Sequence, residues 1–217
     1  MDEKPTAGQV TALKIQARNK NRVNVFLNGE YAFALDLSLA LPLKIGQQLS
    51  ALDIEELQTR DQNAKAYNSA VRLLAQRPRS QAEIEQRLQS KKHSSRAITY
   101  AIERLFSEGY LNDPEFARFW IEDRSRFRPR SARALRYELR QKGLANDVID
   151  EALVELDEEA LAWSAVENKL ERWRLLDREQ FKAKLIGHLA RRGFGYQTAM
   201  TAFERACRNL EDEDSFQ

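Results

Sequence analysis

The chain repeats itself, and this repetition constrains its fold more than any other feature. The step Arg-Pro-Arg-Ser occurs at residues 77–80 and again 51 residues later at residues 128–131. Each copy is followed by two apolar residues at helical spacing, and these pairs are Ile84 with Leu88 and Leu135 with Leu139. Short helices of this kind cannot bury their apolar faces alone, so repeated copies must pack on one another. The sequence therefore predicts a helical repeat protein.

Each repeat is predicted to contain three helices, with the Arg-Pro-Arg-Ser step between the first and the second. The second helix should stop four residues after its last leucine, at Lys92 and at Gly143, because a residue with left-handed backbone closes a helix. In the second repeat the first helix should begin at Asp113-Pro114, with Asp113 as the cap and proline in the first helical position. A fainter third copy keeps this order through Phe181, Leu185, Leu189 and Gly193.

The first 60 residues have a different pattern. Alternating apolar residues up to Leu27 and again from Tyr31 flank Asn28-Gly29, which is a strong signal for a two-residue hairpin turn. A short helical turn capped by Asp36 should come next, and a helix should run from near Asp53 towards Leu74. We expect a small β domain that cannot stand without packing on the neighbouring helices.

These patterns predict a mainly α protein of three tandem three-helix repeats that form a curved helical array behind a small N-terminal β-hairpin domain. The expected divisions are residues 1–61 for the β-rich domain with its connecting helix, 62–112 for the first repeat, 113–157 for the second, and 158–217 for the third with an acidic tail.

The inventory of reactive residues argues against an enzyme. His93 and His188 lie in different repeats and have no neighbours at metal-ligand spacing, and the glycines never form a phosphate-binding loop. Cys207 is expected to be a buried structural thiol. No catalytic residue, metal or cofactor is therefore predicted. A single cysteine, an N-terminus without a signal-peptide pattern and short apolar runs indicate a soluble cytoplasmic protein with no membrane span.

The net charge of +2 hides a separation of sign. Residues 124–142 are rich in arginine, whereas residues 145–161 are acidic and contain no lysine or arginine. Basic residues recur at similar places in successive repeats, so stacking should align them in a stripe suited to a phosphate backbone or an acidic protein groove, rather than leave them as solvated helix faces. The predicted stripe comprises Arg77, Arg79, Arg87, Lys91, Lys92, Arg126, Arg128, Arg130, Arg133, Arg136, Arg140, Lys142, Arg191 and Arg192. Aromatic residues do not interleave with it regularly, so phosphate contact is expected to dominate.

The sequence resembles the RecX family of recombination regulators over about residues 64–210. The matching parts are Arg128 to Gly143, which ends in Leu-Arg-Gln-Lys-Gly, and the junction from Leu105 to Asp113 that continues into Phe116-Ala117-Arg118. The third repeat departs most, because it lacks Arg-Pro-Arg-Ser and contains Trp163 and Trp173.

This resemblance implies a protein, expected to be monomeric, that binds the RecA–DNA filament along its groove, blocks strand exchange and promotes filament loss without chemistry of its own. Single- or double-stranded DNA, held through phosphate contacts, is a further expected partner. Two alternatives remain open from the residues alone. One is a tandem helix-turn-helix transcription regulator that acts without recombinase. The other is a protein-interaction scaffold that ignores DNA.

Overall fold

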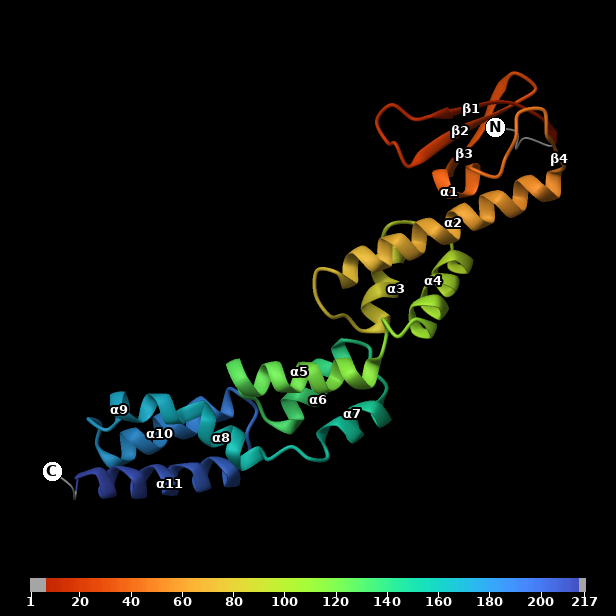
Figure 1. Ribbon diagram of the computed structural model, residues 1–217. Coiled ribbons are helices and arrows are strands. Elements are labelled where there is room, and N and C mark those ends of the chain that lie inside the picture. Colours follow the sequence, from red (N-terminus) through yellow and green to blue (C-terminus); the bar gives the residue numbers. More distant parts are fainter. Residues whose placement is uncertain (1–6, 215–217) are drawn as a thin grey trace. The chain divides into compact units, whose positions relative to one another are not determined.

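The computed structural model describes the backbone of residues 7–214 and the side chains of residues 7–210. The extreme N-terminus, where no signal peptide is predicted, and the side chains of the predicted acidic tail lie outside these residues. The chain divides into two compact units, one of residues 1–79 with 84–111 and one of residues 80–83 with 112–217. The described part is mainly helical, with an antiparallel sheet at its start (Figure 1).

The first unit begins with a four-stranded antiparallel sheet in the order β3-β2-β1-β4. Its strands are β1 (Gly8–Ile15), β2 (Arg22–Leu27), β3 (Glu30–Asp36) and β4 (Gln48–Leu49). The predicted hairpin turn is confirmed, since Asn28 and Gly29 both have positive φ angles, of 51° and 91°. The predicted helical turn is α1 (Leu37–Ala40), capped by the Asp36 carboxylate. The two-residue strand β4 is too short to leave a sequence pattern.

Helix α2 (Ala51–Leu74) connects the sheet to the first three-helix domain. Ser50 and Asp53 form a reciprocal capping box at its start, and Ile54 contributes to the core of the sheet. Further along the helix, the buried Asp61 accepts hydrogen bonds from the Arg22 side chain of β2 and from the Asp36 backbone amide. The predicted boundary between residues 61 and 62 falls inside α2, and the domain divisions stay a prediction.

The first three-helix domain consists of the end of α2 with α3 (Gln81–Ser90) and α4 (Ser95–Ser107). Its core contains Ala66 and Ala70 of α2, Ile84 and Leu88 of α3, and Ala101 and Leu105 of α4. The predicted stop at Lys92 is confirmed by a φ angle of 61°.

The second domain is built from α5 (Asp113–Phe127), α6 (Ala132–Gln141) and α7 (Asn146–Leu153). Leu135 and Leu139 are fully buried, as the repeat pattern predicts. The expectation that Asp113 caps α5 is wrong: the cap is Asn112, whose side-chain oxygen accepts a hydrogen bond from the Glu115 amide at 3.0 Å. Asp113 instead accepts a bond from the Gln81 amide at 3.0 Å.

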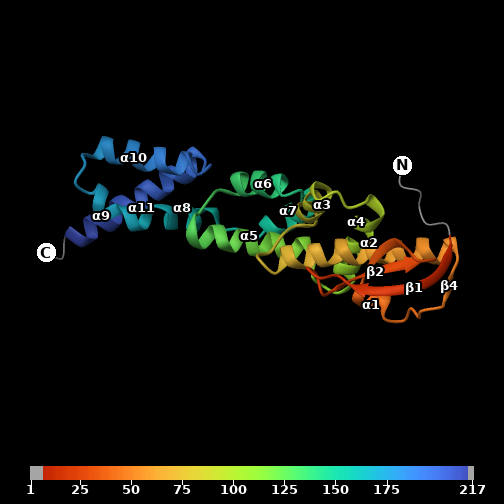
Figure 2. The ribbon, with the colours of Figure 1, turned by 90° about the horizontal axis from the view of Figure 1, so that it is seen from above.

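The third domain is built from α8 (Glu158–Val166), a short 3-10 turn (Glu167–Lys169), α9 (Leu170–Trp173), α10 (Arg178–Ala190) and α11 (Tyr196–Asp214). Trp163 and Trp173, which match no repeat position, are buried in its core with Phe181 and Leu185. Helices α8, α10 and α11 pack on one another (Figures 1 and 2). Cys207 is half-buried at the edge of this core rather than fully enclosed.

Candidate functional site

The serine of the second Arg-Pro-Arg-Ser step lies in a tight joint within the second unit. Ser131 is 0% exposed, and its hydroxyl accepts a hydrogen bond from the Ala134 amide, which caps α6. Its own amide donates to the carbonyl of Arg192, at the end of α10, over 3.2 Å. A Cβ atom built on Gly193 would lie only 2.7 Å from the Ser131 hydroxyl oxygen. The step therefore joins the second three-helix domain to the third.

The serine of the first step makes a comparable contact inside the second unit, to which residues 80–83 belong. Ser80 is 0% exposed, and its hydroxyl donates to the Lys142 carbonyl over 2.6 Å. A Cβ atom on Gly143 would lie 2.3 Å from the Cβ atom of Ala82. These contacts were not predicted from the sequence, although each serine is followed by a helix-closing glycine about 60 residues later.

Four arginines gather at the joint of Ser131 and Gly193. The Arg192 Nε atom is buried and has no hydrogen-bond partner among the described residues. Burial lowers the pKa of Arg192, and the neighbouring Arg130, Arg191 and Arg128 lower it further. Within the described part of the chain, no carboxylate lies within 4 Å of Arg128, Arg191 or Arg192. Of the four arginines, Arg130 is paired with Glu138, so the positive charge without an ion pair in this part of the chain is that of Arg128, Arg191 and Arg192.

Helix α6 begins at this joint, and one of its faces is exposed. Arg133 and Arg140 are exposed on it, because Leu135 and Leu139 occupy the opposite, buried side. The Arg140 Nε atom donates to the Asn146 side-chain oxygen at 2.9 Å, a neutral partner that leaves its charge uncompensated. We call Arg128, Arg133, Arg140, Arg191 and Arg192 together the basic surface.

Other members of the predicted stripe are engaged by neighbours in the fold. Ion pairs join Arg130 to Glu138 at 2.9 Å, Arg136 to Asp150 at 2.6 Å and Lys142 to Glu83 at 2.8 Å. Arg79 Nε donates to the Leu73 carbonyl at 3.1 Å, the Arg77 side chain donates to the Pro78 carbonyl at 2.9 Å, and Arg126 lies over the Phe127 ring. Periodicity predicts which side chains leave the core, but it does not predict which of them meet an acid.

Arg87, Lys91 and Lys92 are exposed near the end of α3, in the first unit. The stripe across all three repeats stays a prediction. Tyr137 was not predicted as a site residue, although it lies four residues after Arg133 and three before Arg140, on the same side of α6.

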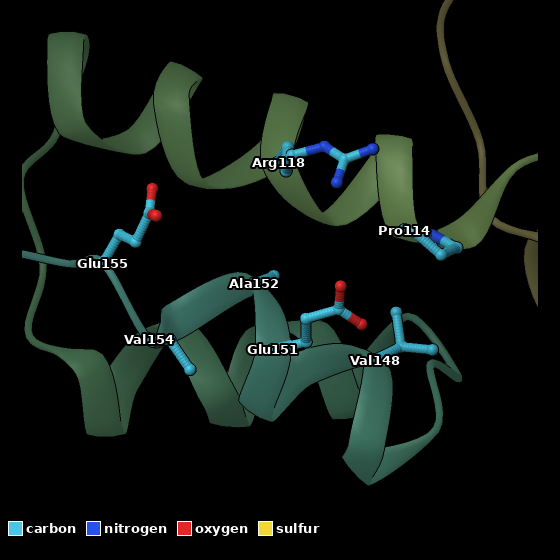
Figure 3. A pocket seen from close by; sticks show the side chains of 7 residues that line it. All are labelled: Pro114, Arg118, Val148, Glu151, Ala152, Val154 and Glu155. Carbon is cyan, nitrogen blue, oxygen red and sulfur yellow. The ribbon is translucent and has the colours of Figure 1, made fainter.

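A hollow of about 350 Å³ lies between α5 and α7 (Figure 3). Arg118 of α5 and Glu151 of α7 border it from opposite sides, and Glu155 stands at its end. Its lining mixes one cation with two carboxylates, so it is distinct in character from the basic surface. Among the described residues no cluster of three or more His, Cys, Asp or Glu side chains is suited to a metal ion. None of the described helices is long and apolar enough to span a membrane.

Comparison with known families accounts for most of the chain. Four family models match in chain order: the regulatory protein RecX N-terminal domain at residues 8–50, and the first, second and third RecX three-helix domains at residues 66–105, 112–153 and 157–203.

Individual relatives agree with these models. The regulatory protein RecX of Bacillus subtilis (strain 168) is 33% identical over 211 residues, which are 95% of this chain and 80% of that protein. The regulatory protein RecX of Clostridium beijerinckii is 29% identical over 199 residues, covering 89% of this chain and 92% of the relative.

Solved structures share the fold. A crystal structure of regulatory protein RecX has a TM-score of 0.68 at 23% identity, with 90% of this chain and 98% of that one covered. The crystal structure of RecX from Lactobacillus salivarius has a TM-score of 0.60 at 21% identity, with 68% of this chain and 97% of that one covered.

Proposed function

Because this chain belongs to the RecX family of regulatory proteins, we propose that it binds the RecA–DNA filament and lowers recombinase activity through its basic surface. The family match supports a regulatory role. The contact itself is inferred from the charges of the second unit, and DNA repair and recombination are the processes in which such a regulator acts.

The observation that carries this proposal is the uncompensated charge around Arg192. Its half-buried guanidinium lies among the charges of Arg128 and Arg191, and its Nε atom has no partner in the described part of the chain. Like charges that are partly removed from water repel one another, and an arriving anion relieves that repulsion. A DNA phosphate or an acidic protein side chain at the filament surface supplies such an anion.

Charge on α7 favours a filament regulator over a tandem helix-turn-helix reader of duplex DNA. In a helix-turn-helix domain the last helix enters the major groove and approaches the phosphates on both sides. The corresponding helix of the second domain exposes Asp147 and Glu151, for which the described residues supply no ion pair. These carboxylates repel a phosphate backbone, so α7 is a poor recognition helix, whereas α6 next to it is basic.

Binding to three ligands separates the candidate functions. The full chain is titrated against bare DNA, recombinase alone, and recombinase assembled on single-stranded DNA. A filament regulator binds the assembled filament most tightly. A duplex reader prefers a particular duplex sequence without recombinase, and a scaffold that ignores DNA binds recombinase equally with and without DNA; either pattern would contradict the proposal.

A further inference from the structure

An exposed tyrosine stands between two arginines on the outer face of α6. Residues 133, 137 and 140 succeed one another at spacings of four and three, so Arg133, Tyr137 and Arg140 share one face of the helix. Tyr137 is 65% exposed, and both arginines are exposed as well. This face is therefore open along its length among the described residues.

The Tyr137 ring is also unengaged, unlike other aromatic rings near arginines in this unit. The Arg124 guanidinium lies 4.1 Å from the centre of the Trp120 ring, and Arg205 lies 4.0 Å from that of Trp163. No described side chain makes such a ring or cation contact with Tyr137. The ring is therefore largely exposed and has no aromatic or cationic partner among the described residues.

Two acids on α6 and α7, Glu138 and Asp150, are paired with cations of the fold, while the Glu158 carboxylate accepts a hydrogen bond from the Ala132 amide at 3.4 Å at the start of α6. Glu138, the acid of α6, accepts hydrogen bonds from Trp120 and Arg124 at 2.9 and 2.8 Å and pairs with Arg130 at 2.9 Å. Asp150 of α7 is paired with Arg136 at 2.6 Å. An approaching phosphate therefore meets Arg133 and Arg140 without a free carboxylate on the same helix.

We propose that Tyr137 stacks on a base of single-stranded DNA while Arg133 and Arg140 contact phosphates on either side of it. Aromatic side chains stack on bases of any sequence, and flanking cations track the backbone. Neighbours on a helix face lie about 5–6 Å apart at Cβ, within one nucleotide's reach. In a duplex the base faces are covered by neighbouring bases, so a single strand fits this arrangement. The inference rests on the proposed function and names the DNA form that the basic surface contacts.

The test compares Tyr137→Ala with Tyr137→Phe in the full chain, on two probes. One probe is an oligothymidylate, and the other is an oligomer of the same length made of abasic nucleotides. Tyr137→Ala should weaken binding to oligothymidylate by roughly 5-fold to 150-fold, the range expected for one stacked base. Its binding to the abasic strand should not change, because the phosphates remain. Tyr137→Phe keeps the ring and should bind both probes as the wild type does.

Tyr196→Ala is the matched control, because Tyr196 is also 65% exposed in the same unit. It should bind both probes normally. Equal loss on both probes, or no loss on either, overturns the stacking role. So does a Tyr137→Ala variant that loses filament binding with unchanged affinity for oligothymidylate, since Tyr137 would then contact protein. Filament inhibition by the wild type is measured separately, so failure of stacking is distinguishable from failure of the proposed function.

Discussion

Replacement of Gly193 by alanine tests the joint between the second and third three-helix domains. Gly193 has a φ angle of +90° at the end of α10. An added Cβ atom would lie 2.7 Å from the Ser131 hydroxyl oxygen and 2.9 Å from the Ala134 Cβ atom. Both neighbours lie at the start of α6, which cannot retreat without disturbing the buried Leu135. The substitution therefore strains the backbone and overpacks the joint.

Two contributions determine how much unfolding free energy Gly193→Ala should cost. Left-handed backbone costs a residue with a side chain about 1–2 kcal/mol relative to glycine. Overpacking of a tight contact adds roughly 1–3 kcal/mol. The sum, about 2–5 kcal/mol, corresponds to a fall in melting temperature of roughly 4–20 °C for a chain of this size.

Thermal unfolding monitored by circular dichroism measures this effect, and Gly187→Ala is the control. Gly187 lies inside α10 with no positive φ, and a Cβ atom there would meet only Arg191 Nη1 at an ordinary 3.5 Å. Alanine is the better helix former, so this variant should gain about 0.5–1 kcal/mol of stability. A Gly193→Ala protein with the melting temperature of the wild type would refute the tight packing of Gly193 against the start of α6.

Two further predictions concern charge. Burial raises the pKa of Asp61, but Arg22, Lys65 and the Asp36 amide lower it more, so the net pKa lies below the ordinary value. The stability that ionised Asp61 contributes is therefore complete above about pH 4, and it is lost as the pH falls through the lowered pKa. Asp61→Ala should cost roughly 3–5 kcal/mol at neutral pH, because it leaves Arg22 without its buried partner. The unfolding free energy of this variant should depend less on pH in acid than that of the wild type. If the five arginines of the basic surface each neutralise one phosphate, affinity for bare single-stranded DNA should fall about 130-fold between 50 and 200 mM salt, and filament binding should fall much less. Titrations at the two salt concentrations measure this, and equal salt slopes for both ligands would count against a filament regulator.

Local signals predicted much of the fold. Asn28-Gly29 predicted the hairpin, Gly143 predicted a helix end, and Leu135 predicted the buried face of α6, because each depends on backbone preference or on periodicity within a few residues. The first helix of the third domain had no such signal. Leu161, Ala162, Trp163, Ala165 and Val166 are all buried in α8, so no amphipathic period marks it.

The candidate site was less predictable, because it depends on contacts between distant residues. Arg136 and Arg133 look alike in the sequence, yet only Arg136 meets a described acid, Asp150, 14 residues away. Ser131 looks like a simple helix cap, and its contact with Gly193 emerges only when two domains pack. Which arginines lack an acidic partner cannot be predicted from the sequence, because the fold decides which distant side chains meet.

Filament inhibition by charge-reversed proteins tests whether the basic surface makes the contact with the filament. One variant carries Glu at the exposed Arg128, Arg133 and Arg191 of the basic surface. Its matched control carries the same charge change at Arg118, Arg172 and Arg178, which are exposed in the same unit. Arg178 lies 13 residues before Arg191, about 20 Å along α10.

Both proteins should keep their melting temperatures, because exposed charges contribute little to stability. Inhibition of recombinase-driven strand exchange is then titrated with each. We expect that the basic-surface variant no longer inhibits and that the control inhibits as the wild type does. Full inhibition by the basic-surface variant, or equal loss in both proteins, would contradict it.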